Sequence, residues 1–382
     1  MKFKYYDDGA LRRQLAGDGF TVIYRIRGTE QEALETAKSM CVEQTVEFPA
    51  QHIECPAILD GVLGHIDYTQ DLKNGWHRVD IVYTAGTAGA DFPQLLNVAF
   101  GNSSIFPDVT LERICLPDSM KKTFPGPKFG VQGMRERLGV YDRPFTFTAL
   151  KPMGLPPEAL AEEAYRCALG GIDLIKDDHG LMDQPFAPFR ERVERAAAAV
   201  RRANEETGGH TAYIPNVSGS FRRMDDRLRL AVDCGCGGVM VAPGLAGFDL
   251  IGYAAEKTSL PVVCHPAFLG GMLDRGRGGV DCACLLGQLP RLAGADITVF
   301  PNFGGRFSLS EEQCAGIRDM ASEDQGAIRP ILPSPAGGMT FEKVGPTREF
   351  YGNDTALLMG GGLFTAPGTL TENCQRFLHE LQ

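Results

Sequence analysis

A run of charged and titratable residues closes one short apolar stretch of the chain. Lys176-Asp177-Asp178-His179 follows Asp-Leu-Ile at residues 173–175. If that stretch is a β-strand, side chains alternate between its faces, and Lys176 and Asp178 share one face. A lysine that faces an apolar interior is costly unless it is paired or used chemically. Two interpretations stay open: a Lys–Asp ion pair at the strand end, or a site for a hard cation such as Mg²⁺, which prefers oxygen ligands.

Three further residues suited to catalysis follow other short apolar runs. Lys151, in T-A-L-K-P-M-G-L, could act as an acid or base on carbon, or as a counter-ion for a phosphate. His265 could be a base, a donor that polarises a carbonyl, or a structural histidine. Arg306, in G-G-R-F-S, could close over a substrate or be a solvated loop arginine.

Glycine runs close the last two apolar stretches, at Gly337-Gly338 and at Gly360-Gly361-Gly362. Glycine lets backbone N–H groups approach an anion closely, although a single run of this kind can also be a simple tight turn. Two runs, one after each of the last two strands, favour a phosphate-binding site.

The elements that must position these residues form a regular pattern after residue 140. Short β-rich runs alternate with amphipathic helical stretches, and eight such pairs fit a (β/α)8 barrel of about 240 residues. A doubly wound open sheet is the alternative, but no G-x-G-x-x-G follows the first strand. In a barrel, the residues above would meet at the C-terminal ends of the strands. The expected strands lie at 145–151, 173–178, 211–218, 238–244, 261–267, 296–302, 329–338 and 354–362, and the expected helices include 157–170, 189–206, 311–322 and 371–381.

The chain before residue 140 has a mixed pattern. A strand is expected at 21–28, a helix at 31–44, and further strands at 77–85 and 95–103. Strands with one or two helices on one face indicate a small α+β domain. We therefore predict two domains, an N-terminal α+β domain at 1–139 and a barrel domain at 140–382.

Composition limits the partners and the compartment. The chain has 382 residues, and its 38 Lys and Arg against 48 Asp and Glu give a net charge of −10. This balance argues against nucleic acid as a partner but leaves room for a small phosphorylated substrate. The N-terminus lacks the apolar region of a secretory signal, and no window is long and apolar enough to span a membrane. The eleven cysteines are therefore expected as free thiols in the cytoplasm, with the two C-x-C pairs as buried thiols rather than zinc ligands.

Several segments in the same order resemble the large subunit of ribulose bisphosphate carboxylase (RuBisCO). The resemblance extends from about residue 20 to the C-terminus. The segments that carry it are T-F-P-G-P-K-F-G-V-Q-G (123–133), F-T-A-L-K-P-M-G-L (147–155), A-L-G-G-I-D-L-I-K-D-D (168–178), Q-P-F-x-x-F-R-E-R (184–192), P-A-G-G-M (335–339) and M-G-G-G (359–362).

The resemblance implies a ferredoxin-like α+β domain joined to a (β/α)8 barrel, in a homodimer or a multiple of dimers. Each active site would lie between the barrel of one subunit and the N-terminal domain of the other. Lys151 would handle the substrate proton, and CO2 would carbamylate Lys176. The carbamate and Asp178 would bind Mg²⁺, with His179 as the third position of the metal motif. The remaining implied residues are Gly337, Gly338, Gly361 and Gly362 for a phosphate, with Glu43 and Asn102 supplied by the partner subunit.

The chain departs from the carboxylases at several of their functional positions. Met153 stands in place of a second lysine, His179 in place of glutamate, and Arg306 in place of the lid lysine. The other departures are Pro266 in place of the arginine that binds a second phosphate, Val299 in place of the next histidine, and Ala336 in place of serine. The loss of the groups for a second phosphate and of the second lysine implies a monophosphate substrate and no carboxylation.

The chain is therefore similar to the RuBisCO-like proteins (form IV), and most similar to their methionine-salvage branch. The leading expectation is a Mg²⁺-dependent 5-methylthioribulose-1-phosphate isomerase. One alternative is a 2,3-diketo-5-methylthiopentyl-1-phosphate enolase, which Asn102 disfavours because that group carries a lysine base in F-G-K. The others are a decarboxylase or hydrolase of a branched 3-oxo acid phosphate of the 3-oxo-isoapionate 4-phosphate type, and a non-catalytic homologue that binds a phosphorylated ligand.

Overall fold

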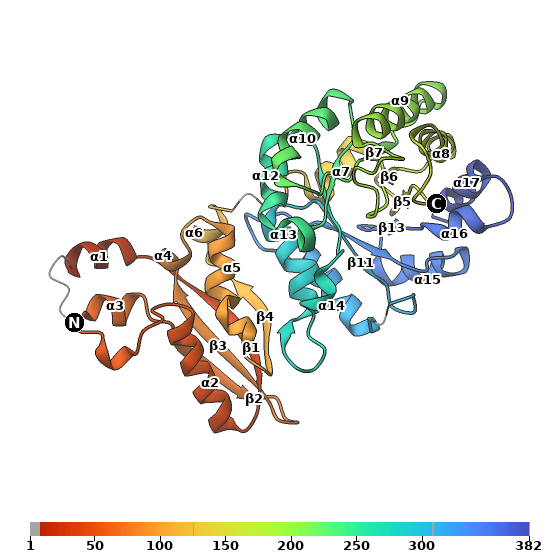
Figure 1. Ribbon diagram of the computed structural model, residues 1–382. Helices are drawn as coiled ribbons and strands as arrows, with labels where there is room; N and C mark the ends of the chain where they lie inside the picture. Colours follow the sequence, from red (N-terminus) through yellow and green to blue (C-terminus); the bar gives the residue numbers. More distant parts are fainter. Residues whose placement is uncertain (1–7, 125, 308, 382) are drawn as a thin grey trace. The chain divides into compact units, whose positions relative to one another are not determined.

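The computed structural model describes residues 8–124, 126–307 and 309–381, and these residues form two compact units (Figure 1). The first unit holds the described residues up to Phe124 together with Gly271–Leu285. The second holds the described residues from 126 to Gly270 and from Leu286 onward. The predicted domain boundary at residues 139 and 140 stays a prediction. In terms of packing, helix α7 (Gly130–Leu138) belongs to the second unit.

The first unit is built on a five-stranded sheet in the order β10-β4-β1-β3-β2. The expected strands at 21–28 and 77–85 are confirmed as β1 (Gly19–Arg27) and β3 (Trp76–Thr84), which pair antiparallel. Every second side chain of β1 from Phe20 to Ile26 is buried, as a strand with one face on a core requires. The remaining strands are β2 (His65–Asp71), β4 (Val109–Cys115) and β10 (Gly279–Val280).

The expected helix at 31–44 is confirmed as α2 (Glu30–Glu43). Thr29 and Glu32 form a capping box at its start, which satisfies two backbone N–H groups that the helix leaves unpaired. The other helices of this unit are α1 (Asp8–Leu15), α3 (Pro56–Gly61), α4 (Ala85–Ala88), α5 (Phe92–Phe100) and α6 (Asp118–Lys121), with 3₁₀ turns at Ala50–His52 and Asn102–Ile105.

The strand expected at 95–103 is wrong, because this segment forms helix α5 and the 3₁₀ turn after it. The Asp91 carboxylate accepts the Gln94 backbone N–H at 2.8 Å and caps the helix. Leu95, Val98 and Ala99 then lie buried at helical spacing. The apolar run is therefore the inner face of a short helix. The helix cap just before it is the sequence signal that distinguishes this helix from a strand.

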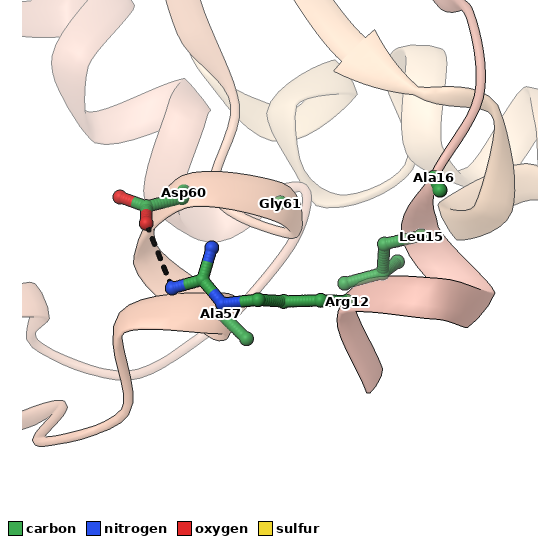
Figure 2. A pocket seen from close by; sticks show the side chains of 6 residues that line it. All are labelled: Arg12, Leu15, Ala16, Ala57, Asp60 and Gly61. Atoms are coloured by element: carbon green, nitrogen blue, oxygen red, sulfur yellow. Dashed lines mark hydrogen bonds and ion pairs between the residues drawn. The ribbon is translucent and has the colours of Figure 1, made fainter. Parts of the chain in front are cut away.

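The first unit also carries a small surface pocket of about 170 Å³ between α1 and α3 (Figure 2). Arg12 reaches across from α1 and pairs with Asp60 of α3 at 3.2 Å. None of the residues predicted to do chemistry lines this pocket. Its other lining residues are Leu15, Ala16, Ala57 and Gly61.

The second unit is a (β/α)8 barrel, and all eight expected strands are confirmed. Two four-stranded parallel sheets, β13-β5-β6-β7 and β12-β11-β9-β8, form its wall. A bridge between Asn216 and Met240 joins β7 to β8, and β12 contacts β13, so the wall closes. The strands are β5 (Phe145–Ala149), β6 (Leu174–Lys176), β7 (Ala212–Ile214), β8 (Val239–Val241), β9 (Val262–Cys264), β11 (Ile297–Pro301), β12 (Leu332–Ala336) and β13 (Ala356–Leu358).

The four expected barrel helices are also confirmed, as α8 (Pro157–Leu169), α9 (Phe189–Thr207), α14 (Glu311–Ser322) and α17 (Leu370–His379). Side chains from all eight strands fill the barrel with an apolar core, and Met134 and Leu138 of α7 pack against it. The remaining helices are α10 (Met224–Asp233), α11 (Pro243–Ala246), α12 (Asp249–Lys257), α13 (Leu289–Ala293), α15 (Phe341–Tyr351) and α16 (Gly361–Thr365), with single turns at Phe221–Arg223, Leu269–Gly271 and Cys284–Gln288.

All eleven cysteines are free thiols, as expected, and most of them are buried. Among the residues that the structure describes, no helix is long and apolar enough to cross a membrane.

A buried carboxylate fixes the start of α7 against the barrel. Asp296 is fully buried and accepts the backbone N–H groups of Phe129, Gly130 and Val262 at 2.7, 2.8 and 3.0 Å. Burial raises the pKa of Asp296, although the three N–H donors oppose this change.

Replacing Asp296 by alanine should lower the free energy of unfolding by about 3–5 kcal/mol, because each buried N–H that loses its acceptor costs about 1–3 kcal/mol. Asp296→Asn keeps an acceptor oxygen and should cost less. Urea unfolding measures both. Asp319→Ala, at a largely exposed aspartate of α14, is the control and should cost less than about 1 kcal/mol. Equal losses for Asp296→Ala and Asp319→Ala would contradict this account.

Candidate active site at the mouth of the barrel

The barrel brings the predicted residues of the second unit to one end. Lys151 follows β5, Lys176 is the last residue of β6, and His265 directly follows β9. Because all strands of the barrel run parallel, their C-terminal ends meet at the same mouth.

Lys151 and Asp178 form the central ion pair of this mouth. Lys151 Nζ donates to Asp178 Oδ1 at 2.7 Å, and about a third of the Lys151 side chain stays exposed. Burial acts to raise the pKa of Asp178, but hydrogen bonds from His179 and Lys151 and the charge of Lys176 outweigh it and hold this pKa well below its usual range. Asp178 is therefore a carboxylate throughout the neutral range.

Lys176 is almost completely buried at the end of β6. Its Nζ donates to the Asp177 carbonyl oxygen at 3.0 Å. Burial lowers the pKa of Lys176 to about 8, with the charge of Lys151 acting in the same direction and Asp178 against it. The sequence suggested an ion pair between Lys176 and Asp178. In the structure, Asp178 pairs with Lys151 instead.

The carboxylate of Asp177 is the anchor of this segment. It accepts from Arg192 Nε at 3.2 Å, from the Tyr213 hydroxyl at 2.7 Å and from the Asn216 backbone N–H at 3.0 Å. Both Asp177 and Arg192 are fully buried. Sequence reasoning assigned no role to Arg192 or Tyr213. The only sequence signal for Arg192 was a charged residue on the inner face of a predicted helix. The only one for Tyr213 was a hydroxyl group within an apolar strand.

Two histidines stack beside Asp178. The rings of His179 and His265 lie 4.9 Å apart and nearly parallel, and His179 Nδ1 lies 3.5 Å from Asp178 Oδ1. Burial and the nearby charge of Lys176 lower the pKa of His265 well below its usual value. His265 Nδ1 accepts the Ala267 backbone N–H at 3.2 Å, so the neutral ring carries its proton on Nε2.

The glycine runs form tight turns at the same end of the barrel. Gly337 and Gly338 both adopt left-handed conformations, with φ of 87° and 90°. A Cβ at Gly360 would lie 3.3 Å from Lys151 Cε, so this turn passes beside Lys151. Gly361 and Gly362 begin the short helix α16.

Arg306 lies on the loop after β11. Its side chain is exposed and packs over Phe307, while its backbone N–H donates to the Gly337 carbonyl at 3.3 Å. This hydrogen bond ties its loop to the first glycine turn.

Glu43 and Asn102 lie in the first unit and are brought together. Asn102 Nδ2 donates to Glu43 Oε1 at 2.9 Å, and Asn102 is exposed. Residues 59 positions apart in the sequence thus form one polar pair.

The donors at the mouth fit a magnesium ion only if Lys176 is modified. Among the described residues, no group of three or more His, Cys, Asp or Glu side chains could hold a metal ion. Asp178 offers carboxylate oxygens and His179 a ring nitrogen, whereas Mg²⁺ prefers several oxygens. A carbamate on Lys176 would add two oxygens at the end of β6 and complete such a set with Asp178.

Glu163 of α8 is a further polar residue that sequence reasoning missed. Its Oε2 accepts the Lys151 backbone N–H at 3.3 Å. Burial raises the pKa of Glu163 from 4.5 to about 7, although the Lys151 N–H and Arg166 oppose this. Glu163 therefore holds the main chain of Lys151 from the helix side of the barrel wall.

Glu163→Gln should stabilise the protein at pH 8 by about 2 kcal/mol and have little effect below about pH 4.5. Because the pKa of Glu163 is higher in the folded than in the unfolded state, its protonated form favours folding. This contribution to the free energy of unfolding is lost as the pH rises toward 7. Glutamine keeps the acceptor for Lys151 without the charge. Urea unfolding at both pH values measures the difference. Glu162→Gln, at an exposed glutamate of the same helix, is the control, and an identical pH dependence of the two variants would refute the prediction.

This fold and site define the class of (β/α)8 proteins with an appended α+β unit and a lysine–carboxylate centre at the barrel mouth. A family described as "Ribulose bisphosphate carboxylase large chain, catalytic domain" matches residues 130–371. The chain is 42% identical to ribulose bisphosphate carboxylase-like protein 1 of Rhodopseudomonas palustris over 363 residues, which cover 94% of this chain and 96% of the relative. It is 38% identical to 5-methylthioribulose-1-phosphate isomerase of Rhodospirillum rubrum, with the same coverage.

Solved structures agree with these matches. The crystal structure of a RuBisCO-like protein from Rhodopseudomonas palustris superposes with a TM-score of 0.86 at 39% identity, covering 96% of this chain and 98% of that one. The chain therefore belongs to the RuBisCO large-chain family, and its relatives include RuBisCO-like proteins.

Proposed function

We propose that this chain is an enolising enzyme that moves protons between adjacent carbons of a phosphorylated ketose, and that its substrate is 5-methylthioribulose 1-phosphate. The observation that carries the proposal is the Lys151–Asp178 pair, 2.7 Å apart and partly open to solvent at the barrel mouth. The Rhodospirillum rubrum relative that bears the name of this isomerase supports the choice of substrate.

The reaction needs a group that exchanges a proton with carbon. As an ammonium paired with Asp178, Lys151 is in the form that donates a proton to the carbon of an enediolate. As the neutral amine, it takes a proton from the hydroxyl-bearing carbon next to the carbonyl; the C–H electrons form a C=C bond and the carbonyl π electrons move onto the carbonyl oxygen. Returning a proton to the former carbonyl carbon, while the hydroxyl proton passes to the former carbonyl oxygen, gives the isomer.

The other residues would hold the substrate in place for this transfer. His265, neutral with its proton on Nε2, is suited to donate a hydrogen bond to a substrate oxygen. The turns at Gly337-Gly338 and Gly361-Gly362 would bind the phosphate through backbone N–H groups. Arg306 would close over the bound substrate, and the Glu43–Asn102 pair of a second subunit would complete the site in a homodimer.

A magnesium ion would be held by a Lys176 carbamate, Asp178 and His179. It would polarise the substrate carbonyl and so acidify the adjacent C–H bond. Carbamylation joins the Lys176 amine to CO2 and releases one proton, and the buried position of Lys176 protects the product from solvent.

Turnover of 5-methylthioribulose 1-phosphate in D2O should give product that carries solvent deuterium on carbon, as mass spectrometry would show. Lys151→Met should lower kcat/KM by about 10³-fold, since it removes the group that moves the proton. Lys257→Met, at an exposed lysine that ends α12, is the matched control and should be fully active. Absence of both product and deuterium at every Mg²⁺ concentration would rule the proposal out, and CO2 release from an oxo-acid phosphate would favour the decarboxylase alternative.

Incubation with ¹³C-bicarbonate and Mg²⁺ should produce a carbamate resonance in the ¹³C NMR spectrum of the protein. Lys176→Met should abolish this resonance, because it removes the amine that reacts with CO2, whereas Lys257→Met should leave it in place. The opposite result is an unmodified chain that shows no carbamate signal under saturating bicarbonate. That result would contradict the proposed magnesium site but would leave the proposed role of Lys151 unaffected.

A further inference from the structure

Two loops at the barrel mouth pack against each other through glycines. One follows β11 and contains Gly304, Gly305 and Arg306, and the other follows β12 and contains Gly337 and Gly338. A Cβ at Gly305 would overlap the Gly337 carbonyl oxygen, and a Cβ at Gly338 would lie 3.3 Å from the Arg306 nitrogen. The two loops can be this close only because these positions lack side chains.

Lys343 joins the two loops. It is the third residue of α15, and its Nζ donates to the Gly304 carbonyl at 2.7 Å and to the Gly338 carbonyl at 3.3 Å. An ammonium has three N–H donors, and the contacts of Lys343 among the described residues use two of them, so one donor is left for a ligand beside the glycine turn. The charge is held in place by two loops rather than by a flexible side chain alone.

The environment of the Lys343 charge differs from that of the other cations described at the mouth. Lys151 is paired with Asp178, and Lys176 is buried within the barrel. Arg306 is exposed and rests on Phe307. Among the described residues, the polar contacts of Lys343 Nζ are to these two carbonyl oxygens, which carry no formal charge, and Lys343 lies directly against the turn that would bind the phosphate.

We propose that Lys343 is a phosphate-site residue, which supplies a fixed positive charge to the Gly337-Gly338 turn and holds the loop of Arg306 against it. The inference rests on the proposed function in one respect, that this turn binds the phosphate of the substrate. A phosphate dianion gains more from a cation that is already positioned than from one that must be ordered on binding.

The test uses the full chain with inorganic phosphate as the probe and three variants. Lys343→Gln should raise the dissociation constant of phosphate, measured by calorimetry, by about tenfold, the effect of losing one charge-assisted interaction. Lys343→Arg keeps the charge and should stay within about threefold. Lys257→Gln, which removes the same charge from the end of α12, should bind like the unmodified chain.

A second measurement reports on the loop itself. An arginine-specific protease should cleave the Arg306–Phe307 bond several-fold faster in Lys343→Gln than in the unmodified chain without phosphate, because the contact to Gly304 is lost. Mass spectrometry identifies the cut. Urea unfolding of each variant confirms that it is folded before either measurement.

The outcomes separate the two proposals. If the unmodified chain binds no phosphate, the proposed function fails at its phosphate site and the role of Lys343 fails with it. If the unmodified chain binds phosphate and Lys343→Gln binds it within twofold, only the role of Lys343 is overturned. Faster cleavage at Arg306 with unchanged phosphate affinity likewise overturns it, since Lys343 would then only tie the loops together.

Discussion

The buried carboxylate of Asp177 is the constraint on which the barrel mouth depends. Its three donors come from α9, from β7 and from the backbone just after β7, so one side chain fixes the point where the chain leaves β6. A buried carboxylate without such partners would cost several kcal/mol, so any conformation that turns Asp177 outward also leaves Arg192 buried and unpaired. With Asp177 held inward, Asp178 is directed to the mouth, where Lys151 meets it. The Lys151–Asp178 pair is thus positioned by a residue that has no role in the proposed chemistry.

The sequence was sufficient to predict the barrel, because each strand carried its own local signal. The apolar runs around Phe145 to Ala149 and Ile297 to Pro301 are short, buried and followed by helical periodicity, which is typical of βα units. Placement at the strand ends then predicted that Lys151, Lys176 and His265 would share one end, because parallel strands leave no other arrangement. In the first unit the same reasoning failed at α5. There an apolar run without alternation was compatible with both the period of a strand and the period of a helix.

The pairing of charged side chains at the mouth could not be predicted from the sequence, because it depends on side chains from distant elements. Lys176 and Asp178 are two residues apart and were the natural ion pair, yet Asp178 pairs with Lys151, 27 residues earlier. Glu163 and Lys343 carried no pattern that distinguished them from other charged residues on helix surfaces. Both act on loop backbone, Glu163 on the Lys151 N–H and Lys343 on two glycine carbonyls. Contacts of this kind depend on loop conformation, which side-chain periodicity does not encode.

The charges at the mouth bear on how an acidic chain could bind the anionic substrate that we propose. The net charge of −10 would repel a phosphorylated sugar if it were spread evenly over the protein. At the mouth, however, the Asp177 carboxylate is neutralised by Arg192, and Asp178 is neutralised by Lys151. Among the described residues, Lys343 of α15 and Arg306 of the loop after β11 have no carboxylate partner, and both lie beside the glycine turn at Gly337-Gly338. A local excess of positive charge at a concave protein surface concentrates anions more strongly than the distant acidic surface repels them, because salt screens charges beyond about 10 Å. The proposed phosphate binding therefore depends on the distribution of charge around the mouth rather than on the net charge of the chain.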